Sequence, residues 1–251
     1  MGNLGAVYAM WKREMIRFTR SKSRIIGSIG MPFFFLAIVG SGLGGAFSMP
    51  GMEGGYMEFI APGMVAMTVL FGSIFSGVTV IMDRQFGFLK ETLVAPVSRL
   101  SIVAGRALGG ATTATLQGLL MVAIAALLGV PLEIAGLPLA MAFMFFSATA
   151  FVFLGIAIAS LMEDMHGFQL VMNLLVMPMF FLSGAIFPLE SAPEIVRYIG
   201  YVDPMTYSVE ALRTLLTGQA GMPLAVCAGV LAALLAAFGL TASYLFGRIE
   251  G

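Results

Sequence analysis

Residues 83–99 have the sequence DRQFGFLKETLVAPVSR, a charged segment between two long apolar stretches. A charged side chain costs roughly 2.5–3.5 kcal/mol at the centre of a bilayer, so we expect this segment to lie outside the membrane. Pro96 stops any helix that begins near Gln85, because proline cannot continue a helix interior. The mixture of apolar and charged side chains predicts a short amphipathic helix that ends in a turn and is suited to dock on another surface.

The composition of the 251-residue chain is that of an integral membrane protein. Hydrophobic residues make up 59% of it and charged residues 10%, whereas soluble domains carry about 25% charged residues. Six stretches without charge or histidine reach the roughly 20 residues that a helix needs to cross the hydrocarbon layer. They are residues 25–52, 59–82, 107–132, 134–162, 167–189 and 214–247. We predict an all-α membrane protein with six transmembrane helices, in a single domain of residues 25–251.

Lys and Arg are distributed unevenly between the two sides of such a fold. Of 13 basic residues, 11 fall in the N-terminal segment, residues 84–106 and the C-terminal end, and the other two are Arg197 and Arg213. Cytoplasmic loops retain positive charge, so both termini and residues 83–106 are predicted to be cytoplasmic, in a protein that crosses the inner or plasma membrane several times. The net charge of zero gives no reason to expect a nucleic-acid partner.

Short segments at the membrane edges complete the predicted architecture. Residues 1–24 place apolar side chains on one helical arc and basic side chains opposite, which predicts an amphipathic helix on the inner membrane surface. A basic tail held by anionic lipid is the alternative. On the outer side, residues 190–213 are predicted to form two short re-entrant helices, the second capped by Asp203 and carrying a Glu210–Arg213 pair.

The chain lacks the motifs that would let it power transport or catalyse a reaction. A phosphate-binding loop has the pattern Gly-x-x-x-x-Gly-Lys-Ser/Thr, but no glycine stands in the four residues before Lys22-Ser23. Proton or sodium coupling usually places charged side chains inside spans, and the six stretches have none, although broken helices could still bind Na⁺ through backbone groups. Glu163 and His166 are too few ligands for a metal. We expect no catalytic residue, no metal site and no cofactor bound by this chain, and therefore a separate motor.

Three stretches resemble the compact membrane subunits of ATP-binding cassette exporters of the type-2 permease class. They are residues 56–63 (YMEFIAPG), Gly87 with residues 90–99 (KETLVAPVSR), and residues 181–188 (FLSGAIFP) with 203–207 (DPMTY) and 210–213 (EALR). The stretches are similar to the family's entry to its second span, its cytoplasmic coupling segment, and its fifth-span exit with the outer helices. Within the class, the chain is most similar to daunorubicin-resistance-like permeases.

The resemblance implies a dimer of identical or related permeases in the lipid bilayer, with two cytoplasmic ATPase subunits that hold ATP and Mg²⁺. It implies a coupling segment at residues 84–106, which receives the motion of the ATPase through Gln85, Phe88, Leu89, Lys90, Glu91, Val94, Pro96 and Arg99. It also implies a substrate path along spans two and five, lined by Thr68, Gly72, Ser76, Thr79, Asn173, Met177 and Phe180. The uncharged spans favour amphipathic or lipid-like cargo, such as a drug or glycolipid, over small ions.

Other interpretations fit the same residues. The small side chains of span two also suit close helix packing, and Asn173 also suits a hydrogen bond between helices. The same architecture could export a polysaccharide or glycoconjugate. A self-sufficient channel or ion-coupled carrier would produce flux in liposomes that contain this chain alone, and a membrane scaffold would show no substrate-stimulated ATPase activity even with a partner.

Overall fold

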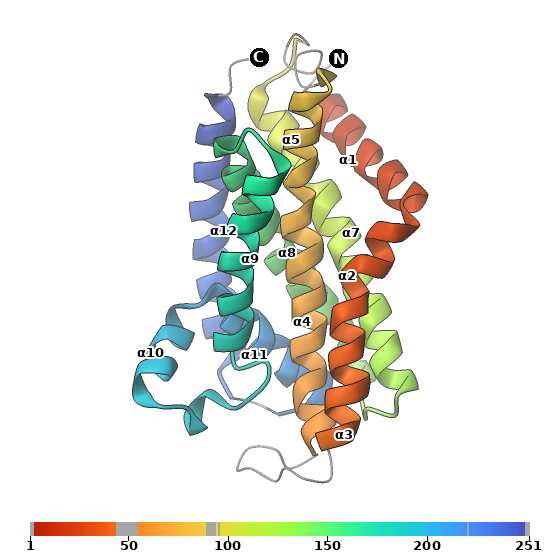
Figure 1. Ribbon diagram of the computed structural model, residues 1–251, viewed down its shortest axis with the longest axis vertical. Coiled ribbons are helices and arrows are strands. Elements are labelled where there is room, and N and C mark those ends of the chain that lie inside the picture. The colour runs from red at the N-terminus through yellow and green to blue at the C-terminus, as the bar shows by residue number, and fades with distance from the viewer. Residues whose placement is uncertain (1–2, 44–54, 89–93, 95, 220, 249–251) are drawn as a thin grey trace.

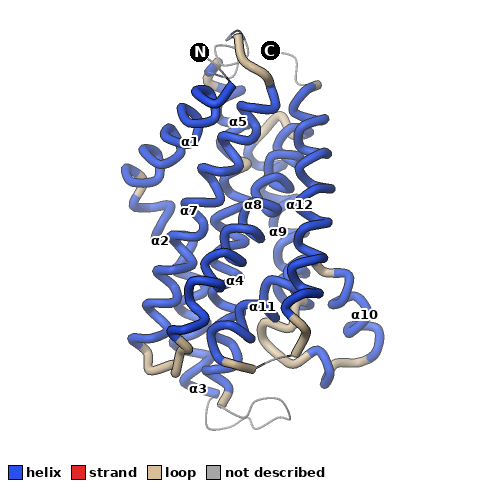
Figure 2. Tube along the Cα trace, turned by 180° about the vertical axis from the view of Figure 1, so that it is seen from behind, coloured by secondary structure: helices blue, strands red, loops and turns tan. Residues whose placement is uncertain are grey.

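The computed structural model describes residues 3–43, 55–88, 94, 96–219 and 221–248, and within them every regular element is a helix (Figure 2). Three short helical elements, η1 (Phe35–Gly40), η2 (Ile134–Gly136) and η3 (Leu189–Ser191), accompany the α-helices. The α-helices are α1 (Asn3–Arg20), α2 (Lys22–Phe34), α3 (Ser41–Leu43), α4 (Tyr56–Ser76), α5 (Val78–Gln85), α7 (Arg99–Leu127), α8 (Leu137–Leu161), α9 (Met165–Leu182), α10 (Glu194–Val202), α11 (Pro204–Thr217) and α12 (Leu224–Gly247).

Five helical segments are long and apolar enough to cross a membrane, which confirms the predicted all-α membrane fold. They are residues 56–85, 99–127, 134–161, 165–182 and 224–247. A sixth crossing is obtained when α1 and residues 25–40 are taken together as one bent pair, with 65° between its two parts. Helix α1 begins and α12 ends at the same end of the molecule, as an even number of crossings requires (Figure 1).

The two ends of the bundle carry different elements (Figure 1). The end where α1 begins and α12 ends, which also carries α5 and the described residues 86–88 and 96–98, is called the terminal end. The opposite end carries α3, α10 and α11 and is called the distal end. Helices α1 and α2 together run from the terminal end toward the distal end, whereas α4 and α5 together span the length of the bundle (Figure 1).

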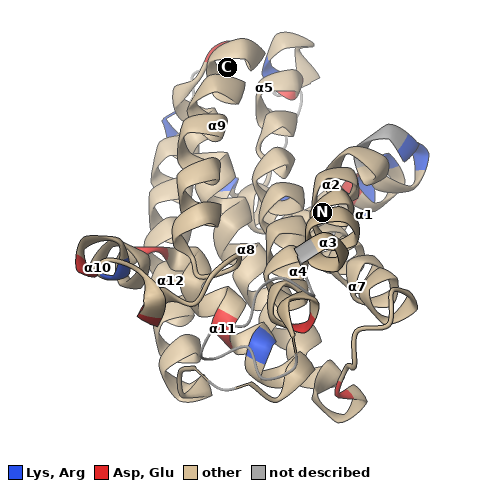
Figure 3. Cartoon of the chain, turned by 60° about the horizontal axis from the view of Figure 1, so that its bottom comes forward, with Lys and Arg blue, Asp and Glu red and all other residues tan. Residues whose placement is uncertain are grey.

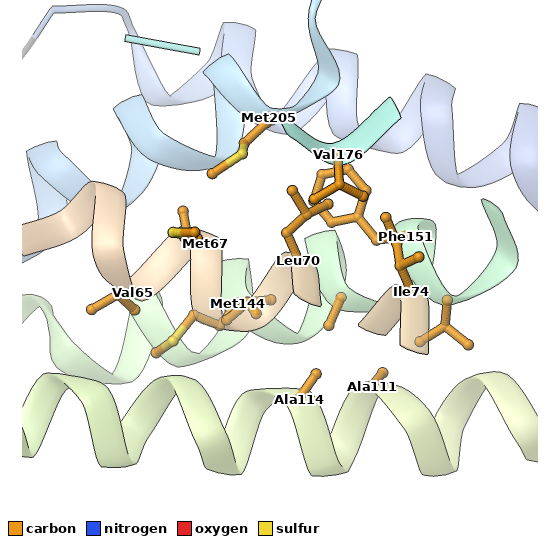
Figure 4. Packing of buried hydrophobic residues seen from close by; sticks show 14 of the residues in the cluster. Val65, Met67, Leu70, Ile74, Ala111, Ala114, Met144, Phe151, Val176 and Met205 are labelled. Carbon is orange, nitrogen blue, oxygen red and sulfur yellow. The ribbon is translucent and has the colours of Figure 1, made fainter. Parts of the chain in front are cut away.

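Helix α4 is the central helix of the bundle. Met64, Met67 and Leu70 have no exposed surface, because α7, α8 and α11 pack around α4. Alanines on α7 let the two helices approach closely, as small residues do in membrane bundles. Figure 4 shows Val65, Met67, Leu70 and Ile74 of α4 facing Ala111 and Ala114 of α7, Met144 and Phe151 of α8, Val176 of α9 and Met205 of α11.

Two glycines bring the backbones of α4 and α8 into contact where α4 passes into α5. A Cβ atom on Gly77 would lie 2.4 Å from the carbonyl oxygen of Gly155, and one on Gly155 would lie 2.7 Å from the carbonyl oxygen of Ile74. Real Cβ atoms do not approach other atoms this closely, so both positions require glycine. The junction between α4 and α5 is therefore fixed against α8 by backbone contact.

The two predicted distal helices are present as α10 and α11. Asp203 caps α11 by accepting a hydrogen bond from the Met205 amide at 2.8 Å, and Glu210 pairs with Arg213, as predicted from the sequence. Asp203 is 7% exposed. Its burial raises the pKa of the carboxyl group to about 7, against the opposing effect of the Met205 hydrogen bond.

Candidate functional site

Asp83, the first residue of segment 83–99, joins three helices at the terminal end. Its Oδ1 atom accepts hydrogen bonds from Arg13 at 2.7 Å and Arg17 at 3.3 Å, and its Oδ2 atom accepts one from Arg106 at 2.5 Å. Arg17 also lies 3.5 Å from Glu14. We call Arg13, Glu14, Arg17, Asp83 and Arg106 the Asp83 cluster; it ties α5 to α1 and α7.

Residues 83–106 were expected to lie outside the membrane, but two of their charged side chains are buried within the protein. Asp83 and Arg106 are only 1% and 2% exposed. Helix α7 begins at Arg99, so residues 99–106 of the predicted coupling segment are its first two turns and carry Arg106 into the bundle. Burial is tolerated because each charge meets an opposite charge, which the sequence alone does not reveal.

Helix α1 packs closely against α7 through two glycines one helical turn apart. A Cβ atom on Gly105 would lie 2.7 Å from Met10, and one on Gly109 would lie 2.7 Å from Glu14. The Trp11 indole donates a hydrogen bond to Thr112 of α7 at 3.1 Å. These contacts fix which face of α1 is turned toward the bundle.

Part of the predicted apolar arc of α1 is not covered by the bundle. Leu4 and Tyr8 of that arc are 86% and 59% exposed, whereas Glu14 is 3% exposed. The glycines of α7 and the pairing of Arg13 and Arg17 with Asp83 hold the face of α1 that carries Glu14 against the bundle. The position of α1 on the inner membrane surface stays a prediction.

The far end of segment 83–99 is anchored on two other elements. The backbone amide of Ser98 donates a hydrogen bond to the Asn3 side chain of α1 at 3.2 Å. The Arg99 guanidinium donates to the carbonyl oxygen of Gly247, at the last turn of α12. Together with Asp83, these bonds hold both ends of the segment on the bundle.

The coupling residues predicted from the sequence fall into a described and an undescribed group. Gln85, Phe88, Val94, Pro96 and Arg99 are described and all are exposed, as a docking surface requires. Gln85 donates to the backbone oxygen of residue 163 at 3.4 Å, and the guanidinium of residue 13 lies 5.7 Å from the Phe88 ring centre. The predictions for Leu89, Lys90 and Glu91 lie outside the described residues.

Three of the predicted path residues of span two, Gly72, Ser76 and Thr79, contact α7 within this chain. Gly72 lies against Gln117 and Ala114, and Ser76 lies against Gly110. Thr79 accepts a hydrogen bond from Arg106 at 3.4 Å, and the hydroxyl of Thr68 donates to the backbone oxygen of Met64 at 2.8 Å. These contacts fit the interpretation in which the small side chains of span two allow close packing of helices. The path role of Thr68, Gly72, Ser76 and Thr79 stays a prediction.

The predicted path residues of span five differ in exposure, although their spacing places them on one face of α9. Phe180 is buried and its ring packs edge-on against Phe35 of η1, with 6.0 Å between ring centres. Asn173 is exposed and Met177 is half-buried, on the side of the helix that also exposes Leu174. Among the described residues Asn173 forms no hydrogen bond, so the helix-bridging bond considered for it is not formed within this chain.

The Asp83 cluster is a functional element that was not predicted from the sequence. Two signals for it were present. Arg13 and Arg17 are four residues apart and so lie on one face of a helix, and Gly105 and Gly109 have the same spacing on α7. Neither signal identifies its partner helix without the three-dimensional structure.

Comparisons with known proteins agree with this architecture. The family model of the ABC-2 type transporter matches residues 5–217. Nodulation protein J of Rhizobium leguminosarum bv. viciae is 29% identical over 216 residues, which cover 84% of this chain and 82% of that protein. The inner membrane transport permease YadH of Escherichia coli (strain K12) is 26% identical over 252 residues, which cover 98% of this chain and 96% of that protein. With helices that can cross a membrane six times and a family match over most of its length, the chain belongs to the ABC-2 type transporter family.

Proposed function

We propose that this chain is the membrane subunit of an ATP-driven exporter and that a separate cytoplasmic ATPase docks on segment 83–99. The observation that carries the proposal is the exposure of apolar side chains on this anchored segment. Phe86 is 68% exposed, Phe88 50% and Val94 83%. Apolar side chains gathered on an exposed surface outside the membrane are typical of a protein interaction site.

The anchors of the segment provide a route from the ATPase to the spans. If the ATPase displaced residues 84–98, α1 and α7 would move with them, because arginines of these two helices donate hydrogen bonds to the carboxylate of Asp83. The displacement would reach α8 through the backbone contact of Gly77 and Gly155. ATP and Mg²⁺ would be held by the ATPase subunits. Their association would favour one of two arrangements of the helices, as a docked partner with unequal affinity for two states does.

A second copy of this chain, or a related permease, would complete the exporter. Helix α9 supports this part of the proposal, because it exposes Leu170, Leu174 and Phe181 by 72%, 78% and 46% along one side. Asn173 lies on the same side, where an amide can pair across an interface between two copies. The predicted path of spans two and five would then lie near this interface.

The proposed cargo is amphipathic or lipid-like and would move outward, with both termini on the cytoplasmic side. An uncharged cavity of about 320 Å³ between α2 and α4–α5 supports this class, because an apolar chain could enter it from the bilayer. Its lining residues are Gly27, Ser28, Phe71, Gly72, Phe75 and Val78. A polysaccharide or glycoconjugate is the alternative cargo for the same architecture.

Val94→Asp tests the docking surface directly. We expect the variant to lose co-purification with the ATPase subunit and ATP-dependent transport, while the spans stay folded, because Val94 is 83% exposed. The matched control is Val202→Asp at the distal end, where Val202 is 81% exposed and assembly should be normal. Glu91→Arg is expected to weaken the same complex. Normal assembly in both Val94→Asp and Glu91→Arg would refute the docking site.

Cysteine cross-linking tests the pairing of two copies through α9. Leu174→Cys is expected to form a disulfide-linked dimer in membranes. Leu240→Cys on α12 is the control, because Leu240 is 74% exposed and so equally accessible. The native Cys227 has no exposed surface and should stay unreacted. Equal cross-linking at both positions, or none at Leu174→Cys, would contradict this interface.

A further inference from the structure

A cavity of about 580 Å³ opens at the distal end, far from segment 83–99. Its size lies within the 300–1,000 Å³ range of small-molecule sites. The start of α4, the chain around η3, and α11 with the loop that follows it form its walls. Its lining residues are Glu58, Phe59, Pro188, Leu189, Glu190, Tyr201, Glu210, Arg213, Thr217, Gly218, Gln219, Gly221 and Met222.

The single basic residue among the lining residues is engaged by protein groups. Arg213 is 5% exposed and donates hydrogen bonds to the Glu210 carboxylate and, at 2.7 Å, to the carbonyl oxygen of Gly184. Its guanidinium carbon also lies 4.1 Å from the centre of the Phe59 ring. Viewed toward the distal end, Figure 3 shows an acidic and a basic segment close together at α11. Arg213 therefore neutralises Glu210 and has little capacity left for a ligand.

Two further carboxylates leave the lining with an excess of negative charge. Glu58 accepts a hydrogen bond from the Gln219 amide nitrogen at 3.0 Å, and Glu190 forms no ion pair among the described residues. The Oε1 atom of Gln219 is buried and has no hydrogen-bond donor within the described part of the chain. An N–H group of a ligand would satisfy this acceptor and would meet the charge of Glu58 beside it.

The arrangement of these groups selects an organic cation over a metal ion. The described residues contain no cluster of three His, Cys, Asp or Glu side chains that could hold a metal. The lining also includes four apolar or aromatic side chains, Phe59, Leu189, Tyr201 and Met222. Such walls can bury an apolar body and can also attract a cation through the face of an aromatic ring.

We propose that the distal cavity binds the ammonium group and apolar body of an amphiphilic amine, with Glu58 and Glu190 supplying the opposing charge. The inference rests on the proposed function, because it makes the cavity the exit site of an exporter and names amines as one class of its cargo. Glu210 and Arg213 would hold the wall in shape, while Gln219 would accept an N–H bond from the ligand.

Binding of 4-phenylbutylamine, compared with the neutral 4-phenylbutanol, tests the proposal on the full chain in lipid nanodiscs. At pH 7.5 the amine is protonated, so the two probes have the same apolar body and differ in charge. We expect the amine to bind at least tenfold more tightly, after subtraction of binding to empty nanodiscs. Each of the two carboxylates should contribute about fivefold in Kd, or about 1 kcal/mol.

Glu58→Gln and Glu190→Gln should each weaken amine binding about fivefold and leave 4-phenylbutanol binding unchanged, which also shows that the cavity is folded. The matched control is Glu194→Gln on α10, a carboxylate at the same end that does not line the cavity. Equal affinity for both probes would overturn the proposal, as would full amine binding in both variants or an equal loss in Glu194→Gln. The measurement needs no ATPase, so its failure would leave the docking proposal standing, and failure of the Val94→Asp test would leave this cavity untouched.

Discussion

Asp83→Asn removes the negative charge that holds three arginines, and we expect it to release α1 from the bundle. The side chains of Arg13 and Arg17 are 34% and 29% exposed, so they can turn to solvent, at a cost of about 0–1 kcal/mol each. Arg106 is 2% exposed, and its side chain cannot turn to solvent in the same way. Leaving a buried charge without its partner costs roughly 3–5 kcal/mol. Because the asparagine oxygen still accepts a hydrogen bond, we take the lower value, about 3 kcal/mol.

Hydrogen–deuterium exchange of the α1 amides in nanodiscs measures this release. A loss of about 3 kcal/mol corresponds to roughly a hundredfold rise in the population with α1 undocked, and to a similar rise in exchange rate. Glu163→Gln is the matched control, an exposed carboxylate at the same end without an ion pair among the described residues. Adding Arg106→Gln to Asp83→Asn should restore most of the protection, because no buried charge is then left over. Unchanged exchange of α1 in Asp83→Asn would refute the reasoning.

Three further predictions follow from contacts elsewhere in the bundle. Between about pH 4 and 7 the folded chain keeps a proton on Asp203 that the unfolded chain has lost, so stability falls as pH rises through this window and stays lower above it. Asp203→Asn cannot ionise, so it should avoid this loss of up to roughly 4 kcal/mol in the free energy of unfolding, while its side-chain oxygen still caps α11. The Tm of the variant should therefore exceed that of the wild type by a margin that grows from pH 5 to pH 8. Gly155→Ala should lower stability by about 1–3 kcal/mol in thermal unfolding, whereas Gly229→Ala, with no atom within 4 Å of its new Cβ, should not. Arg213→Lys should cost about 2 kcal/mol, because an ammonium group cannot reach both acceptors and lie flat on the neighbouring ring; equal Tm values would contradict this.

Features of the fold that depend on nearby residues could be predicted from the sequence. Five of the six apolar stretches gave the positions of spans, because each must bury its backbone hydrogen bonds in a helix within hydrocarbon. The stretch at residues 25–52 did not, since its helix counts as a crossing only together with α1. Asp203 and the Glu210–Arg213 pair predicted the start and one internal contact of α11, since a cap and an i, i+3 pair involve only a few neighbouring positions. The packing of α7 against α8 is a local feature of the same kind, because only residues 128–136 separate the two helices.

Features that depend on which helices are neighbours could not be predicted. The small residues around Gly72 indicate a face that packs closely, but the sequence does not show that α7 covers it. The burial of Asp83 and Arg106 could not be predicted because their partners are distant in the chain. Arg13, for example, lies 70 residues before Asp83. The charge of the distal cavity was missed for the same reason, since Glu58, Glu190 and Gln219 come from three separate segments.

ATP-driven transport in proteoliposomes tests most directly whether this chain is a gate moved by a separate motor. Vesicles that contain the chain alone should neither hydrolyse ATP nor concentrate an amphiphilic amine. Vesicles that also contain its ATPase should do both, and Val94→Asp should abolish the transport. Uphill transport by the chain alone would contradict the account, and so would undiminished transport by the complex that carries Val94→Asp.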